Sequence, residues 1–349
     1  DAGREQAKEV FKRPISEDNI EVYYEYACAL YEESKISEAL IAFQDIVKFD
    51  KNYRESRQYL NWLAAIREEI AASAGDTVVG ELPLGLVINN RYELLQLIGK
   101  GGMGIVYRAA DRELNITVAL KILRPKYSYD PDFIEMIKRE VTLARMLTHP
   151  NILKIYDLGR AGNLWFISME FLEGKELKKV IKEHGHLPID MIKKTLQQVL
   201  SGLEHSHQHN LVHSDIKPHN IFIDDKGNAT IVDFGISRAA GFISPDATIT
   251  GTPEYISPEQ IQGDAVTAQS DLYSLGITLY EMATGEMPFS GPDIDTILEL
   301  QLEMVPPSPN ELRADIPSWL NRIIMKLLVK DSRNRYQSAA EVQRDIPVI

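Results

Sequence analysis

The chain of 349 residues contains one cysteine, Cys28, and no long hydrophobic run. A single cysteine excludes a disulfide within the chain and suits the reducing cytoplasm, where we expect this protein. No stretch approaches the roughly 18 to 20 apolar residues of a membrane-spanning helix, so no membrane segment is expected in this chain. No signal peptide opens the chain, and a start at Asp1 instead of Met is consistent with a piece of a longer protein.

Positive charge is scarce as well. The chain has 38 Lys and Arg residues against 51 Asp and Glu, which gives a formal net charge of −13. A nucleic acid partner usually requires clustered basic charge, and so does non-specific attachment to an anionic membrane. We therefore expect neither.

Glycine is absent from residues 5–73, which contain one proline and have apolar residues at helical spacing. This pattern predicts helices, and we assign residues 1–75 to a helical region. The 34-residue segment Ile20 to Tyr53 resembles the tetratricopeptide repeat, a pair of antiparallel helices. The matching positions are Tyr23, Tyr26, Ala27, Leu30, Ala39 and Phe43. The match is partial, because Lys51 stands where proline is usual, and a plain helical hairpin remains the alternative.

About one repeat is too little to bury a continuous core, since stacked repeats generally need about three units. Either the array is longer than this chain, or the helices dock elsewhere. The small residues of 71–76 indicate a short linker, and residues 76–90 lead into the next domain. We expect intramolecular docking through the apolar residues around Trp62, Leu63 and Ile66. Binding of a partner protein is the alternative.

A polar run of the sequence carries the chemistry. It reads His213-Ser214-Asp215-Ile216-Lys217-Pro218-His219-Asn220 and is followed by Asp233-Phe234-Gly235. This order places two carboxylates, an ammonium and an amide at the spacing used for phosphoryl transfer from a magnesium nucleotide.

A glycine-rich segment precedes this run, namely Gly99-Lys100-Gly101-Gly102-Met103-Gly104. Such a segment also marks dinucleotide-binding folds, where a helix follows it. Here the residues from Ile105 to Ala109 have strand composition, which disfavours that alternative. We expect a strand, a tight loop over phosphates and a second strand. Lys121 lies on a further expected strand, and Glu140 lies on the amphipathic stretch from Pro131 to Leu147.

With these motifs, the chain resembles the eukaryotic-like Ser/Thr protein kinases, in particular their bacterial branch, from Arg91 to Asp345. Gly251 to Glu259 is similar to the end of an activation segment, and Asp271 to Gly276 to the buried helix that anchors the catalytic loop. Arg335 resembles the arginine that pairs with Glu259. The resemblance implies an α+β, bilobal kinase fold over residues 91–349, with a strand-rich lobe followed by a mostly helical one. The clearest helices are expected at 189–209, 270–284 and 316–329.

The resemblance also implies a site for ATP and Mg²⁺, or Mn²⁺. Asp215 would accept the proton of the incoming hydroxyl and Lys217 would neutralise the transferring phosphate. Glu140 would aim Lys121 at the α- and β-phosphates. Asn220 and Asp233 would be the metal ligands. The nucleotide-binding set is Ile98, Gly99, Gly101, Gly102, Gly104, Val106, Ala119, Lys121, Met169, Glu170, Leu172 and Phe222.

Four histidines invite a metal hypothesis: His205, His207, His209 and His213. Residues at i and i+2 do not share a helix face, so three such ligands would diverge. We therefore prefer the alternative that a helix ends near Asn210 and that His213 packs beneath Asp233-Phe234-Gly235.

Ser214 departs from the family, in which an arginine commonly precedes the catalytic aspartate. That arginine helps to gather a phosphate on the activation segment. With Ser214, phosphorylation of Thr248 or Thr250 lacks its usual partner, unless a cation such as Arg238 substitutes.

The expected activity is that of a non-specific serine/threonine protein kinase (EC 2.7.11.1), including autophosphorylation. Lys217 and the Gly251-Thr252-Pro253 segment resemble the Ser/Thr class rather than the tyrosine class. The alternative is a catalytically weak pseudokinase that acts as an interaction scaffold. Pseudokinases usually lose one of four residues that this chain retains, which disfavours it. Those residues are Lys121, Asp215, Asn220 and Asp233.

Overall fold

A computed structural model of the chain describes residues 14–32, 36–54, 56–57, 59–60, 63, 82–128, 131–161, 164–234 and 252–348. Its contacts divide the chain into two compact units. The first comprises Asp1–Ile134 with Tyr156–Phe171, and the second comprises Glu135–Ile155 with Leu172–Ile349. The domain boundary predicted at residue 75 lies outside the described residues and stays a prediction.

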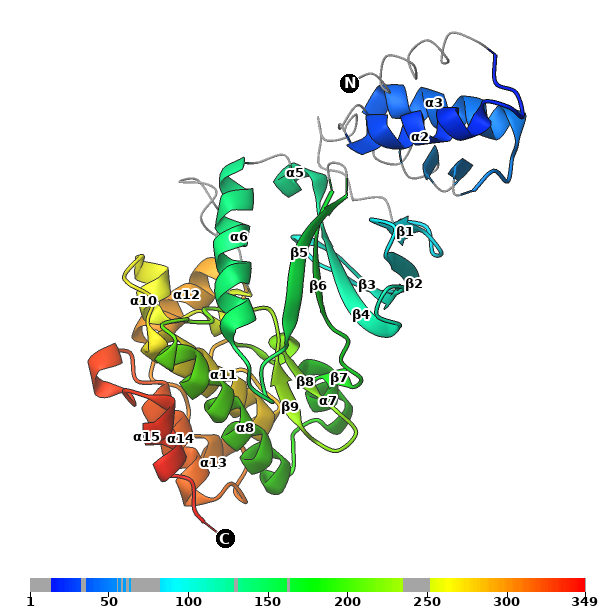
Figure 1. Cartoon of the computed structure of the whole chain (residues 1–349). Coiled ribbons are helices and arrows are strands. Elements are labelled where there is room, and N and C mark those ends of the chain that lie inside the picture. Colours follow the sequence, from blue (N-terminus) through cyan, green and yellow to red (C-terminus); the bar gives the residue numbers. More distant parts are fainter. Residues whose placement is uncertain are drawn as a thin grey trace. The chain divides into compact units, whose positions relative to one another are not determined.

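The first unit contains a six-stranded sheet in the order β1-β2-β3-β4-β6-β5 (Figure 1). The strands are β1 (Val87–Ile88), β2 (Tyr92–Lys100), β3 (Gly104–Asp111), β4 (Ile116–Leu123), β5 (Ile155–Ala161) and β6 (Leu164–Glu170), and a short helix α5 (Pro125–Ser128) follows β4. Pairing is antiparallel from β1 through β4 and between β4 and β6. The predicted order of strand, glycine loop and strand is therefore confirmed.

Strand β3 has residues that alternate in burial, whereas the second half of β4 is buried throughout. In β3, Tyr107 and Ala109 are buried, whereas the residues between them are half-buried, as the period of two in a strand requires. Just before β2, Arg91 donates to both oxygens of the buried Asp111 carboxylate at the end of β3. The hydrogen bonds from Arg91 hold the pKa of Asp111 below its usual value, although burial opposes them.

The first unit also contains two consecutive helices, α2 (Ile20–Glu32) and α3 (Ile36–Phe49). The small residues Ala27 and Ala39 are fully buried where the helices pack, and Phe43 is buried with them. The Phe43 ring stacks on the Tyr59 ring, with 4.8 Å between the centroids. The two helices that the apolar spacing predicts are confirmed. A repeat array is not confirmed, because the helices described in this region lie within residues 20–49 and at a few positions of 56–63.

The second unit is mostly helical. Its helices are part of α6 (Pro131–Met146), α7 (Leu177–His184), α8 (Ile189–Gln208), α10 (Pro258–Gln262), α11 (Ala268–Thr284), α12 (Ile294–Glu303), α13 (Pro309–Leu312), α14 (Ser318–Leu327) and α15 (Ala339–Arg344). A small sheet joins β7 (Lys175–Glu176), β8 (Ile221–Ile223) and β9 (Ala229–Ile231). Three short 3₁₀ helices lie at Pro218–Asn220, Pro253–Tyr255 and Ser332–Asn334. The three helices expected from periodicity are present within about two residues of their predicted ends.

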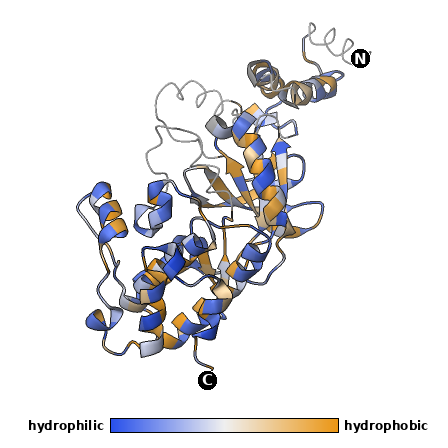
Figure 2. Cartoon of the chain, turned by 90° about the vertical axis from the view of Figure 1, so that its left-hand side faces the viewer, coloured by the Kyte–Doolittle hydropathy of each residue, from blue (hydrophilic) through white to orange (hydrophobic). Residues whose placement is uncertain are grey.

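Helix α11 forms the centre of the second unit, since every residue from Ser270 to Ala283 is buried. Gly276 is required there, because a Cβ atom would lie 2.8 Å from the Cβ of Leu327 on α14. The helices around α11 have one hydrophilic and one hydrophobic side, whereas the strands of the large sheet are mainly hydrophobic (Figure 2). This is the distribution that burial of one helix face produces.

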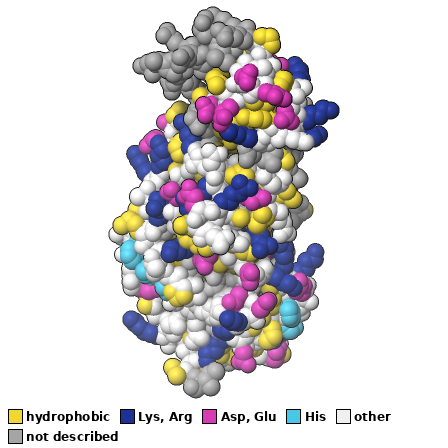
Figure 3. All heavy atoms as spheres, turned by 45° about the vertical axis from the view of Figure 1, so that its right-hand side comes forward, with side chains coloured by type: hydrophobic (Ala, Val, Ile, Leu, Met, Phe, Trp, Pro, Cys, Tyr) yellow, Lys and Arg dark blue, Asp and Glu magenta, His cyan; other side chains and the backbone are white. Residues whose placement is uncertain are grey.

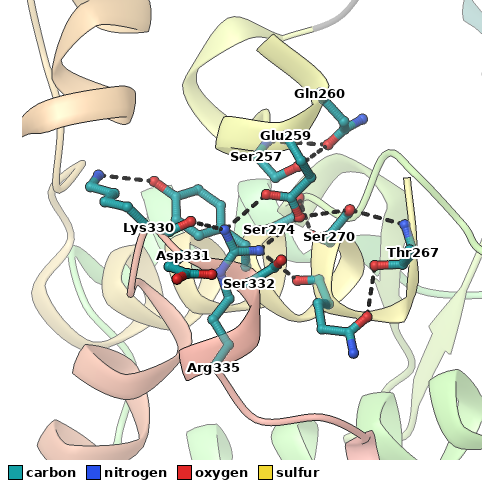
Figure 4. Close-up of polar contacts among 12 residues, drawn as sticks. Ser257, Glu259, Gln260, Thr267, Ser270, Ser274, Lys330, Asp331, Ser332 and Arg335 are labelled. Carbon is teal, nitrogen blue, oxygen red and sulfur yellow. Dashed lines mark hydrogen bonds and ion pairs between the residues drawn. The ribbon is translucent and has the colours of Figure 1, made fainter. Parts of the chain in front are cut away.

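A buried ion pair ties α10 to the C-terminal helices (Figure 4). Arg335 donates from both terminal nitrogens to the two carboxylate oxygens of Glu259, over 2.7 and 2.8 Å. Burial raises the pKa of Glu259, but the bonds from Arg335 and Ser270 outweigh it and keep that pKa below its usual value. The predicted pairing of these two residues is confirmed.

Acidic and basic side chains are interspersed on the molecular face in Figure 3, and neither sign gathers there into one large field. Among the described residues, no helix combines the length and the apolar character that crossing a lipid bilayer requires.

Candidate active site

The loop after α8 brings two of the predicted catalytic residues together with one of the predicted metal ligands. The Lys217 ammonium lies 2.9 and 2.8 Å from the two carboxylate oxygens of Asp215. The Asn220 amide nitrogen donates to the backbone carbonyl of Asp215 and to its Oδ2 atom, both over 2.8 Å. The short 3₁₀ helix that begins at Pro218 turns Asn220 back toward Asp215. An ammonium and an amide thus hold one carboxylate in a fixed orientation.

Helix α11 anchors this loop through Asp271. Its Oδ2 accepts the backbone N–H of His213 over 2.9 Å, and its Oδ1 accepts that of Ser214 over 2.7 Å. Oδ2 also lies 2.8 Å from Nε2 of His207. The anchoring role expected for this helix is therefore confirmed.

The histidine hypothesis is settled by other contacts. Helix α8 ends at Gln208, and the His213 ring packs edge-on against Phe234 with 4.6 Å between centroids. His213 Nε2 lies 2.8 Å from the carbonyl oxygen of Val232. The expected packing of His213 against this segment is confirmed at Phe234, and Gly235 lies outside the described residues.

The first unit brings together several residues of the predicted nucleotide set. Val106 on β3 lies opposite Lys121 on β4, and Ala119 on β4 lies opposite Met169 on β6. At the glycine loop, Gly104 is required by close packing, because a Cβ atom there would lie 2.3 Å from the carbonyl oxygen of Ile122. Gly101 donates its N–H to the Gly104 carbonyl over 2.9 Å, which closes the turn.

The remaining members of the set fall in different places. Gly99 lies in β2, Gly102 lies in the loop and Glu170 ends β6. Ile98, also in β2, is 44% exposed, so it is no part of the unit's buried core. The second unit contains Leu172, Phe222 on β8, and Glu140 on α6. The roles of these residues, including the pairing of Lys121 with Glu140, stay predictions.

The chemistry of Asn220 and Asp233 fits a hard cation. The Asn220 nitrogen makes the contacts with Asp215, which leaves the amide oxygen as its ligand atom. Carboxylate and amide oxygens are the ligands that Mg²⁺ prefers. Asp233 has φ +61°, a left-handed conformation that non-glycine residues adopt rarely and that recurs at functional sites. Gly235, which completes this motif, lies outside the described residues.

Sequence reasoning missed a second charged cluster in this unit. Glu281 on α11 is buried, and its carboxylate accepts the Lys178 ammonium and the Tyr255 hydroxyl, both over 2.5 Å. Burial raises the pKa of Tyr255 far above its usual value, and Glu281 raises it further. The available signal was Glu281 itself, a charged residue within a segment that the sequence predicts to be a buried helix, because a buried carboxylate requires partners.

Comparison with known proteins identifies the chain. The family model for the protein kinase domain matches residues 92–345. The chain belongs to the protein kinase family. It is 41% identical over 264 residues to a probable serine/threonine-protein kinase of Clostridium acetobutylicum, covering 74% of this chain and 40% of that protein. It is 41% identical over 265 residues to the serine/threonine-protein kinase PrkC of Bacillus subtilis, covering 75% of this chain and 41% of PrkC.

A third relative of this kinase chain is the serine/threonine-protein kinase PknB of Mycolicibacterium smegmatis, 37% identical over 267 residues, with 74% of this chain and 43% of PknB covered. The chain thus spans about two fifths of the length of these curated relatives. Among solved structures, the kinase domain of Mycobacterium tuberculosis PknI superposes with a TM-score of 0.61 at 24% identity, covering 76% of this chain and 100% of that domain. This last likeness shows the kinase fold alone.

Proposed function

We propose that this chain is a bacterial-type Ser/Thr protein kinase that transfers the γ-phosphate of ATP to protein hydroxyls, its own included. The observation that carries the proposal is the Asp215 carboxylate, held by Lys217 and Asn220 and anchored through Asp271. A positioned carboxylate beside an ammonium suits proton removal from a hydroxyl and neutralisation of a phosphate. The names of the relatives support the Ser/Thr class.

In this mechanism Asp215 accepts the proton of the substrate hydroxyl, and Lys217 lowers the negative charge near the transferring phosphate. Asn220 and Asp233 would hold Mg²⁺ or Mn²⁺ through oxygen atoms, and such a cation would supply positive charge against the phosphate oxygens. Lys121, aimed by Glu140, orients the α- and β-phosphates. These assignments follow the family. The contacts described above support those of Asp215, Lys217 and Asn220.

The nucleotide itself would lie against the first unit. The glycine loop from Gly99 to Gly104 provides backbone N–H groups for phosphates. Ala119 and Met169, neighbours across β4 and β6, offer an apolar surface for the adenine ring.

Phosphate transfer from radiolabelled ATP to the chain itself and to a generic acceptor protein, followed by phosphoamino-acid analysis, tests the proposal. We expect phosphoserine and phosphothreonine. The Asp215→Asn variant should lose about 10²- to 10⁴-fold in turnover and keep its nucleotide affinity, because the base acts on the acceptor hydroxyl. Turnover within a few-fold of wild type would contradict the assignment of Asp215.

We further propose that the N-terminal helices dock on the strand-rich part of the first unit and regulate it. The support is a cavity of about 330 Å³ lined by Cys28, Tyr31 and Tyr59 of the helical region and by residues 86–90 and 160–161. Leu63, one of the predicted docking residues, is fully buried. Trp62 and Ile66 lie outside the described residues.

The single cysteine makes this docking measurable. The alkylation rate of Cys28 should be several-fold lower in the whole chain than in residues 1–77 alone, provided that circular dichroism shows the short piece to be helical. A Cys28→Ala chain with Val22→Cys is the control, because Val22 is exposed on the same helix and should react equally fast in both. Equal Cys28 rates in the two chains would indicate a separate recruitment module.

A further inference from the structure

The residue before Asp215 has an unusual backbone. Ser214 has φ +68°, a left-handed conformation that a side chain disfavours and that persists only where neighbouring groups hold it. Its hydroxyl oxygen is buried and has no hydrogen-bond partner among the described residues. The contacts that hold Ser214 are therefore made by its backbone and not by its side chain.

Side chains from two helices hold that backbone. The Ser214 N–H donates to Asp271 of α11 over 2.7 Å, and the Ser214 carbonyl accepts a hydrogen bond from Nε2 of Gln260 on α10 over 3.0 Å. Both bonds lie on the peptide groups that lead into Asp215. The position of the Asp215 carboxylate consequently depends on Gln260 as well as on Asp271.

Gln260 is itself fixed by the start of its own helix. Its Oε1 accepts the backbone N–H of Ser257 over 3.1 Å and the Ser257 hydroxyl over 2.9 Å, which forms a capping box. Figure 4 shows Gln260 beside Ser257, while the neighbouring Glu259 points the other way, onto Arg335. An N–H can only donate and a carbonyl can only accept, so the amide nitrogen must face Ser214 and the oxygen Ser257.

We propose that Gln260 is a positioning residue for phosphate transfer: it links Ser257, at the end of the activation segment, to the backbone of Ser214 and so orients Asp215. The link is uncharged. It stands in a chain that lacks the arginine through which related kinases couple the catalytic loop to a segment phosphate. The proposal rests on the kinase activity proposed above and assigns a residue that acts through another.

A purely structural role for Gln260, as part of the cap of α10, is the alternative to exclude. Gln260→Glu separates the two roles. Glutamate is a regular partner in a capping box, so the acceptor for Ser257 is kept. An ionised carboxylate carries no N–H, so the bond to the Ser214 carbonyl is lost and a negative charge faces that oxygen. Ser257→Ala does the reverse: it weakens the cap and leaves the Gln260 donor in place.

Steady-state kinetics and thermal unfolding of the whole chain distinguish these roles. We expect Gln260→Glu to lower kcat about tenfold, the effect of one lost hydrogen bond in the transition state, with Tm and the KM for ATP close to wild type. Ser257→Ala should lower Tm and reduce kcat less than Gln260→Glu does. Gln262→Ala, on the exposed side of the same helix, is the matched control and should change neither.

Backbone amide exchange gives a readout that does not require turnover. Exchange at Ser214 and Asp215 should be faster in Gln260→Glu than in wild type and unchanged in Gln262→Ala. Unchanged kcat and exchange in Gln260→Glu would overturn the proposal, and so would a kcat loss that parallels a fall in Tm. If the wild-type chain transferred no phosphate, the proposed function would fail, and amide exchange would still decide whether Gln260 holds the loop.

Discussion

The surroundings of the catalytic loop and the α2–α3 helix pair are held together by different forces. Around the loop, buried charges meet specific partners, as in the Arg335–Glu259 pair, whose side chains are 0% and 11% exposed. In the helix pair, buried aromatic and aliphatic side chains pack together, and the ion pair between Arg54 and Glu21 is largely exposed. A buried charge requires a partner of one chemical type, whereas packing requires mainly the right volume.

This difference explains why the sequence motifs around the catalytic loop are clear, whereas the repeat pattern of the helical region is weak. Replacement of one partner of a buried ion pair leaves an uncompensated charge, so such residues keep their identity and their spacing. Aromatic packing tolerates exchange among large side chains. The repeat pattern of the helical region is accordingly degenerate, with Tyr23 standing in for tryptophan.

The largest expected effect on stability comes from breaking the buried pair. Arg335→Leu leaves the Glu259 carboxylate buried without its cation and should lower the free energy of unfolding by about 3–5 kcal/mol. Chemical denaturation of the whole chain measures this. Arg333→Leu is the matched control, because the Arg333 pair with Asp331 is exposed and its loss should leave the midpoint unchanged. If both variants lost the same free energy of unfolding, the buried pair would be no more important for stability than an exposed one, and the contrast between the two regions would fail.

Lys330 gives a second test, through pH. Its ammonium donates to the Tyr273 hydroxyl over 3.2 Å and lies 3.9 Å from the centre of the Phe289 ring. Burial, together with the nearby charge of Arg335, lowers the pKa of Lys330 to about 8. The folded state therefore releases this proton near pH 8, while the unfolded chain keeps it until about pH 10.4.

Between these two values the unfolded state binds more protons, so the contribution of Lys330 to stability must rise with pH. Relative to a Lys330→Met variant, wild type should gain about 1–2 kcal/mol from pH 8 to pH 10.5, a value discounted for the partial exposure of this group. Denaturation midpoints of both chains across that range give the difference. A stability difference between the two chains that does not change with pH would show that Lys330 stays charged in the folded state.

Much of the fold was predictable from sequence, because its signals are local. The strands flanking the glycine loop are rich in β-prone residues, and helices such as α8 and α14 show one apolar face. The Glu259–Arg335 pair and the anchoring role of α11 were predictable from motif order. Strand register carries a weaker signal, because it depends on pairing between segments that are distant in the sequence, such as β4 and β6.

The candidate site was predictable where each residue type dictates one role, as for Asp215 and Asn220. The contacts of Gln260 with Ser214 and of Glu281 with Lys178 were not, since they join positions 46 and 103 residues apart. The Ser-x-x-Gln spacing predicts a capping box at α10. It gives no indication that the other end of the same amide reaches the catalytic loop.

A smaller loss of stability is expected from a substitution within the helix pair. Phe43→Leu should lower the free energy of unfolding by about 1 kcal/mol, because leucine fills most of the volume and no polar partner is lost. Near-UV circular dichroism during thermal unfolding measures the change, and Phe49→Leu, at an exposed position of the same helix, is the control. A loss as large as that of Arg335→Leu would mean that the helix pair is as specific as the charged network.

The smallest effect is expected from removing the candidate phosphate acceptors of the activation segment. Thr248 and Thr250 lie outside the described residues, so this prediction rests on Ser214 and its contacts. In kinases with an arginine before the catalytic aspartate, a segment phosphate orders the loop through charge-assisted bonds. Here Asp271 and Gln260 already hold both backbone groups of Ser214.

The double variant Thr248→Ala, Thr250→Ala should therefore keep most of the kinase activity. Wild type treated with a phosphatase should keep most of its activity as well. Initial rates with a generic acceptor protein measure it, with mass spectrometry to verify the phosphorylation state. A collapse to background would show that another cation, such as Arg238, has taken over the role of the missing arginine, and that uncharged contacts alone do not order this loop.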